Sequence, residues 1–356
     1  MCRSGGTVRD GWVMGSTMHD VARLAGVSIK TVSNVINDFP HVRPDTRDRV
    51  QAAIDELDYR PNLSARGLRS GKTGVIGLAV PALRENYFAE LADAVIRAAD
   101  VRGLGVVVEQ TSGERSRELQ AVSGGRLRLT DGLVFSPSAL GQSDASALDT
   151  DFPLVLLGER IFNGPTDHVA MHNTTSARAA VEHLIDTGRR RIAIIGAEEQ
   201  RGIEVSSASL RLDGYLEALD QAGIPVDQRL IRPSIHWNHA AGAETTRQLI
   251  DEGIAFDAVF ALNDSMGLGA LRALGESGMR VPEDVAVIGF DNTDEAHFSV
   301  PSLTSVDVGR EQIAASAVDL LIERIEEKGD RRPPRTVTPD FRIVRRESTG
   351  FPGTRH

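Results

Sequence analysis

Residues 20–37, with the sequence DVARLAGVSIKTVSNVIN, decide how the rest of the chain is interpreted. Apolar residues recur at helical spacing on both sides of Gly26, a pattern typical of two short helices joined by a tight turn. Ser28 can cap the second helix, because its hydroxyl can accept from backbone N–H groups that lack partners in the first turn. The stretch predicts a helix-turn-helix with these apolar positions: Val21, Ala22, Leu24 and Ala25, then Val32, Val35 and Ile36.

The second predicted helix carries side chains suited to contact with DNA. An α-helix fits the major groove, where polar side chains bind base edges and phosphates. An ordinary helical hairpin is the competing interpretation, because two short amphipathic helices around a glycine occur in many folds. The exposed face of the helix is expected to present Ile29, Lys30, Thr31, Ser33 and Asn34.

A third helix is expected to begin at Pro44, since proline at the first helical position loses no hydrogen bond. Arg43 precedes it and cannot cap it as a serine or threonine would. Three helices make a small domain, and residues 59–73, YRPNLSARGLRSGKT, follow it. From Met18 to Lys72, and onward through nearly the whole chain to Arg346, the sequence resembles the lac repressor family of bacterial transcription regulators.

The resemblance implies how the head would meet double-stranded operator DNA. Ile29, Lys30 and Asn34 would face base edges, and a segment over residues 62–69 would fold as a hinge helix when two copies meet on DNA. Two helical turns are too short to be stable alone, so a plain linker is the alternative interpretation. The phosphate contacts would be Ser28, Thr31, Ser33 and Asn37, and the hinge contacts Asn62, Ala65 and Leu68, with Leu68 wedged into the minor groove.

Charge and composition limit the classes of protein to which this chain can belong. The chain of 356 residues carries a net charge of −10, yet residues 1–72 hold eleven basic against eight acidic side chains. This asymmetry suits a small DNA-reading head on an acidic body. The only cysteine is Cys2, and no apolar run reaches eighteen residues, so we expect a cytoplasmic protein without membrane spans, internal disulfides, metal or cofactor.

No catalytic motif is evident in the sequence. Residues 67–73 look like a phosphate-binding loop but have three residues between the glycines instead of four, and no strand precedes them. The sequence contains neither a Gly-x-Ser-x-Gly elbow nor a His-Glu-x-x-His helix. We therefore expect a protein that is not an enzyme.

After Thr73, short apolar runs alternate with helix-length amphipathic segments, which predicts α/β architecture with two parallel sheets covered by helices. The resemblance implies a bilobed core like that of periplasmic sugar-binding proteins, with the chain crossing between lobes near His172, Ser305 and Val337. The expected domains are a disordered extension (1–17), the all-α head (18–60), the hinge and linker (61–72), the first lobe (73–171 and 306–336), the second lobe (172–305 and 337–346) and a tail (347–356).

Polar residues follow several predicted strands, at the edge where ligands bind parallel sheets. Ser136, Asn263 and Asp291 stand at such ends, and Arg211 lies near the start of a helix. The resemblance implies that Arg211, Asn263 and Asp291 bind a small effector. These groups suit vicinal hydroxyls or a polar ring.

Three aromatic residues join the expected effector site. Tyr87, Phe88 and Trp237 stand where relatives stack the effector. Two alternatives remain: Trp237 could simply cover a lobe, and Arg211 with Asp291 could form an interlobe ion pair in the empty state. The main hypothesis is a homodimeric, operator-binding repressor controlled by a small molecule, such as a sugar or sugar derivative. The alternative is a ligand receptor of the periplasmic-binding-protein type that does not bind DNA.

Overall fold

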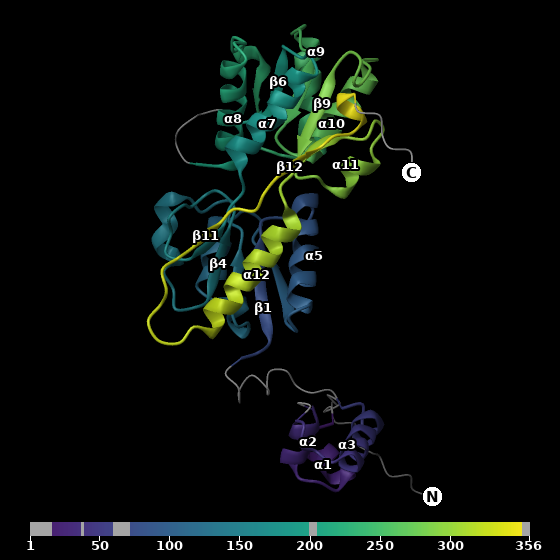
Figure 1. Cartoon of the computed structure of the whole chain (residues 1–356), viewed down its shortest axis with the longest axis vertical. Helices are drawn as coiled ribbons and strands as arrows, with labels where there is room; N and C mark the ends of the chain where they lie inside the picture. Colours follow the sequence, from purple (N-terminus) through teal and green to yellow (C-terminus); the bar gives the residue numbers. More distant parts are fainter. Residues whose placement is uncertain (1–15, 37–38, 60–71, 199–204, 351–356) are drawn as a thin grey trace, which may run out of the picture. The chain divides into compact units, whose positions relative to one another are not determined.

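The computed structural model describes residues 16–36, 39–59, 72–198 and 205–350. It divides into two compact units, Met1–Thr73 and Gly74–His356, which are described separately. Figure 1 shows the small helical unit and the larger α/β unit. The predicted contact residues Asn37, Asn62, Ala65 and Leu68 lie outside the described residues, as do most of the predicted extension, the hinge and the end of the tail.

The small unit is the predicted helix-turn-helix with a third helix. Its helices are α1 (Met18–Ala25), α2 (Ile29–Ile36) and α3 (Pro44–Glu56). Gly26 ends α1 in the left-handed region at φ 64°, and the Ser28 hydroxyl accepts from the backbone N–H of Thr31 at 3.1 Å, which confirms the predicted cap. Arg43 makes no side-chain cap. The core contains Val21, Ala22, Ala25, Val32, Val35, Val50, Ala53 and Tyr59.

The first helix of the head adds detail to the sequence prediction. Leu24 lies in α1 as predicted but is 46% exposed, because Val21, Ala22 and Ala25 form the buried side of the helix. Ser16 and Thr17 were assigned to a disordered extension. Thr17 instead caps α1 in a reciprocal arrangement with Asp20, and the Ser16 hydroxyl donates to the carbonyl of Leu57 at 2.8 Å.

The larger unit contains two six-stranded sheets, each forming one lobe. The first-lobe sheet has the order β11-β5-β4-β3-β1-β2, and the pairs are parallel. The second-lobe sheet has the order β12-β10-β9-β8-β6-β7, and only β12 runs antiparallel to its neighbour among the paired strands. The first-lobe strands are β1 (Val75–Val80), β2 (Gly105–Gln110), β3 (Leu133–Phe135), β4 (Leu154–Leu157), β5 (Asp167–Val169) and β11 (Thr336–Val337). The second-lobe strands are β6 (Ile192–Ala197), β7 (Ile231–Pro233), β8 (Ala258–Ala261), β9 (Ala286–Phe290), β10 (Thr304–Asp307) and β12 (Arg342–Val344).

Helices cover both faces of each sheet, as expected for strands that are buried on both sides. In the first lobe, α5 (Asn86–Asp100) and α12 (Arg310–Glu326) share one core cluster, and α6 (Arg115–Val122) packs in another. In the second lobe, α7 (Asn173–Asp186) and α8 (Ser207–Gln221) lie on one face. The other face carries α9 (His239–Asp251) and α10 (Asp264–Glu276), with short α11 (Asp294–Phe298) nearby.

The chain passes between the sheets after β5, after β10 and after β11. The second passage lies beyond the expected Ser305, because Val306 still pairs with β9 and Asp307 with β12. The predicted tail also begins too early. Ser348 is fully buried, and its hydroxyl donates to the carbonyl of Val287 at 2.6 Å, so residues 347–350 belong to the second lobe. Among the described helices, none combines the length and apolar character needed to cross a bilayer.

Candidate functional site

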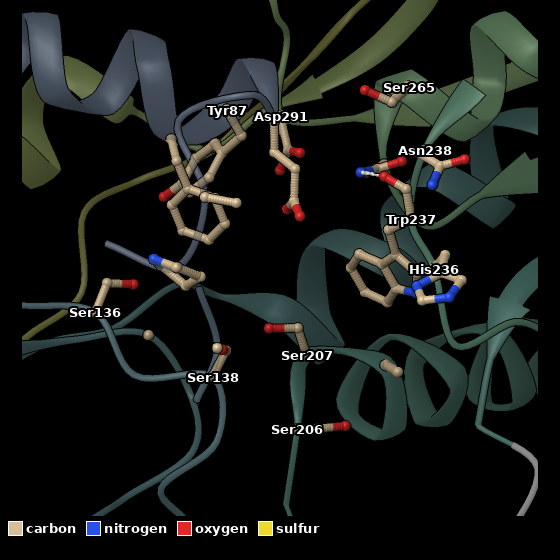
Figure 2. A pocket seen from close by; sticks show the side chains of 18 of the residues that line it. Tyr87, Ser136, Ser138, Ser206, Ser207, His236, Trp237, Asn238, Ser265 and Asp291 are labelled. Atoms are coloured by element: carbon tan, nitrogen blue, oxygen red, sulfur yellow. Dashed lines mark hydrogen bonds between the residues drawn. The ribbon is translucent and has the colours of Figure 1, made fainter. Parts of the chain in front are cut away.

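A cleft of about 1490 Å³ lies between the lobes, at the carboxyl ends of strands from both sheets. Loops after β3 and β4 line it from the first lobe, and loops after β6, β8 and β9 from the second. Figure 2 shows side chains from both lobes around an open space. The cleft brings together every residue predicted for effector binding: Tyr87, Phe88, Ser136, Arg211, Trp237, Asn263 and Asp291.

Arg211 is held rigidly in the second lobe. Its Nε donates to the side-chain oxygen of Asn173 at 2.7 Å, and its Nη1 donates to the carbonyl of Leu262. The guanidinium carbon lies 3.5 Å from the ring centroid of Phe290 and 5.3 Å from that of Trp237. These contacts fix the orientation of the planar guanidinium. Arg211 can therefore donate hydrogen bonds to a ligand with little loss of side-chain entropy.

Asp291 lies close to Arg211, with Nη2 and Oδ1 3.9 Å apart. The sequence left open that these two residues form an ion pair between the lobes. This alternative is wrong, because Arg211 lies in α8 and Asp291 follows β9, and both elements belong to the second lobe. Burial raises the pKa of the Asp291 carboxyl to about 8, although Arg211 acts in the opposite direction. The surroundings of Asp291 therefore favour a protonated carboxyl at neutral pH, and a ligand that donates hydrogen bonds would favour its ionisation.

The turn that carries Asp291 has an uncommon backbone conformation. Asp291 has φ 104° and Asn292 has φ 50°, in the region that favours glycine. Asp264, which is fully buried, supports this turn by accepting from the backbone N–H of Thr293 at 2.7 Å and from the hydroxyl of Ser305 at 2.6 Å. Burial raises the pKa of Asp264 to about 7.

Asn263 has a structural task that the sequence did not indicate. Its Nδ2 donates to the carbonyl of Trp237 at 3.0 Å, and its Oδ1 accepts from the backbone N–H of Met266 at 2.9 Å as the cap of α10. The Trp237 indole in turn donates to the carbonyl of Gly196 at 3.0 Å. Asn263 therefore orients the aromatic wall of the cleft, in addition to any direct contact with a ligand.

The first lobe supplies the opposite aromatic wall. Tyr87 and Phe88 lie in the first turn of α5 with an edge-to-face arrangement and centroids 5.2 Å apart. Burial, together with the carboxyls of Asp291 and Glu159, raises the pKa of Tyr87 above its usual value, so its hydroxyl stays neutral. Ser136 follows β3 and is buried at the same edge.

Glu159 is a cleft residue that the sequence analysis missed. It follows β4, is 4% exposed, and accepts from the hydroxyl of Ser207 at 2.8 Å and from the backbone N–H of Met171 at 3.0 Å. The signal was present, since Glu159 follows an apolar strand just as Ser136 does. Its bond to Ser207 joins the two lobes.

The candidate DNA-reading helix is α2. Val32 and Val35 are buried, whereas Lys30 is exposed and Thr31, Ser33 and Asn34 are partly exposed. Ile29 is partly buried and packs against the head core. The hydroxyls of Ser28 and Thr31 lie 2.9 Å apart at the start of the helix. The predicted polar side chains thus stand on the side of α2 that the head leaves uncovered.

Comparison with known proteins defines the class of this molecule. Residues 17–62 match the model of bacterial regulatory proteins of the lacI family, and residues 181–349 match a periplasmic binding protein-like domain. Two curated relatives are the HTH-type transcriptional repressor PurR of Pasteurella multocida and the ribose operon repressor of Escherichia coli K12. The first is 32% identical over 92% of this chain and 97% of its own length, the second 33% identical over 87% and 93%.

Solved structures agree. A regulator from Sanguibacter keddieii, described as a putative transcriptional regulator of the LacI family, has 49% identity, covers 78% of this chain and 99% of its own, and gives a TM-score of 0.73. The lac repressor dimer bound to operator and the anti-inducer ONPF is 30% identical. The match covers 94% of this chain and 99% of the lac repressor chain, with a TM-score of 0.78. The chain belongs to the lacI family of bacterial regulatory proteins. It is a DNA-binding transcriptional regulator and not an enzyme, and the alternative of a receptor without DNA binding is not favoured.

Proposed function

We propose that the chain is a homodimeric, sequence-specific repressor whose affinity for its operator is controlled by a small polyhydroxylated molecule, a sugar or sugar derivative. The observation that carries this proposal is the convergence of Arg211, Asp291 and Trp237 in one interlobe cleft. A fixed donor, an acceptor and an aromatic face are the groups that recognise a polar ring with hydroxyls.

The head supplies the other half of the proposal. In a dimer, two copies of α2 would enter successive major grooves and read half-sites about one helical turn apart. Lys30 and Asn34 are assigned to base edges, and Ser28, Thr31 and Ser33 to phosphates, because hydroxyl groups set the register without reading sequence. Asn37, Asn62, Ala65 and Leu68 complete the proposed DNA contacts.

Two linked experiments test the function. Genomic fragments would be selected with the full-length protein at moderate salt, and a near-palindromic site should emerge. A thermal-shift screen of sugars and nucleobases would then identify a ligand, whose affinity is measured by calorimetry for wild type and for Asp291→Ala. Equal affinities would contradict the site assignment. Failure to enrich any sequence, both without ligand and with each candidate small molecule, would contradict the assignment as a repressor.

A further inference from the structure

Glu90, on α5 of the first lobe, joins the two lobes beside Asp291. Its Oε1 accepts from the backbone N–H of Asp294 at 3.0 Å, at the start of α11 in the second lobe. Its Oε2 lies 2.5 Å from Nη2 of Arg310, the first residue of α12. The Glu90 side chain is 25% exposed and that of Arg310 is 18% exposed, so water screens this pair only in part.

Arg310 makes a further contact between the lobes, next to that of Glu90. Its Nη1 donates to the carbonyl of Asp291 at 3.2 Å. Glu90 and Arg310 thus form one ion-paired unit, which we name the clasp, and the clasp holds the backbone of residues 291–294 at two points. Both contacts use backbone groups, so they fix the position of the turn whatever side chains it carries.

The second lobe also holds the turn of residues 291–294 through contacts of its own. Within that lobe, Asp264 accepts from Thr293, and the hydroxyl of Ser305 accepts from the backbone N–H of Asn292 at 3.0 Å. The Asp291 side chain therefore stands on a turn anchored to both lobes. A relative movement of the lobes must either carry this turn along or break the clasp.

We propose that Glu90 and Arg310 are positioning residues that hold the lobes together at Asp291. This assignment rests on the proposed function, since it gives the clasp a role in the response to the effector. The strength of the clasp then sets how readily the lobes rearrange, because a ligand can shift their equilibrium only by its differential affinity for the two states. Weakening the clasp then adds a population in which the two lobes stand further apart.

The test measures the distance between the lobes in the full-length protein without DNA or ligand. Cysteines replace Ser116 on α6 and Gln248 on α9 in a Cys2→Ser background, and both carry dyes for single-molecule energy transfer. Labelled chains are diluted into excess unlabelled chain, so that each signal comes from one subunit. Glu90→Gln and Arg310→Gln should each add a population with a longer interlobe distance.

The matched control is Glu311→Gln. Glu311 pairs with Arg97 at 2.6 Å, joining the same two helices within the first lobe, and both side chains are more than half exposed. This variant should leave the distance unchanged. A shift of equal size in Glu311→Gln would overturn the proposal, because general loosening of α5 and α12 would then explain the effect.

Hydrogen exchange provides a second readout. Exchange at the Asp294 amide should rise about tenfold in Glu90→Ala, as expected for the loss of one hydrogen bond to a charged group. Circular dichroism first establishes that each variant is folded. If Glu90→Gln does not fold, Arg310→Gln tests the proposal in its place. Folded clasp variants whose interlobe distances match those of the parent would overturn it. Because no DNA or ligand is present, this result is independent of whether the proposed function holds.

Discussion

The carboxylate of Glu159 in the first lobe accepts a hydrogen bond of 2.8 Å from the hydroxyl of Ser207, at the start of α8 in the second lobe. The other Glu159 oxygen accepts from the backbone of Met171, beside the first passage between the lobes. A buried carboxylate that lines the cleft thus links the two lobes.

Removal of the Ser207 hydroxyl should destabilise the protein. Ser207→Ala leaves one Glu159 oxygen without this donor in a buried position, which should cost about 1 to 3 kcal/mol of unfolding free energy. Urea denaturation of the full-length protein measures the change. Ser123→Ala is the control, because the Ser123 hydroxyl bonds only to the nearby carbonyl of Gln120 on an exposed surface. Equal stability of Ser207→Ala and wild type would refute the importance of the link.

The raised pKa of Asp291 predicts a pH dependence of stability. In the unfolded chain this carboxyl titrates near 3.8, and in the folded protein near 8. Between these values the folded state holds a proton that the unfolded state has lost, so unfolding free energy falls as pH rises through this window. The melting temperature of Asp291→Asn should therefore fall less between pH 5 and pH 8 than that of wild type. Parallel curves would mean that Asp291 keeps an ordinary pKa.

Gly289 should be required for the Asp291 turn. A Cβ at this position would lie 2.2 Å from Oδ1 of Asp264, whereas a Cβ at Gly275, on α10, would meet nothing within 4 Å. Gly289→Ala should lower the unfolding free energy by about 1 to 3 kcal/mol through overpacking and should weaken ligand binding. Gly275→Ala should instead stabilise the helix, by about 0.5 to 1 kcal/mol. Both values follow from chemical denaturation, and a tolerated Gly289→Ala would show that Asp264 can move.

Lys30 tests the assignment of α2 to base reading. Lys30→Ala should weaken binding to the selected operator by about 1 to 3 kcal/mol, as expected for loss of a base contact. Fluorescence anisotropy on operator and random duplexes measures both affinities, and ligand affinity should not change. An equal loss on random DNA would instead indicate a phosphate contact.

The sequence was sufficient to predict the elements whose pattern is local. The helix-turn-helix followed from apolar spacing around Gly26, and β1 from one uninterrupted apolar run. The cleft residues were predictable where a polar side chain follows such a run, as with Ser136. Strands β7, β11 and β12 have few residues and partly exposed patterns, so periodicity gave no signal for them.

Other features depend on contacts between distant segments, which no local pattern reveals. Glu90 and Asp294 are 204 positions apart in the chain, yet they form a hydrogen bond. Asn263 was predicted to bind the effector, and the fold adds hydrogen bonds of its amide to Trp237 and Met266 that no local pattern indicated. Whether a polar residue supports the site or contacts its ligand is decided by the tertiary fold.

Occupation of the cleft should control the affinity of the protein for its operator. Operator affinity of the full-length protein is determined by anisotropy with and without saturating ligand, for wild type and Asp291→Ala. The ligand should change the affinity of wild type by about 5-fold to 150-fold, the usual range of allosteric coupling, and should not change that of Asp291→Ala. If wild type binds operator equally well with and without bound ligand, the cleft does not control DNA binding.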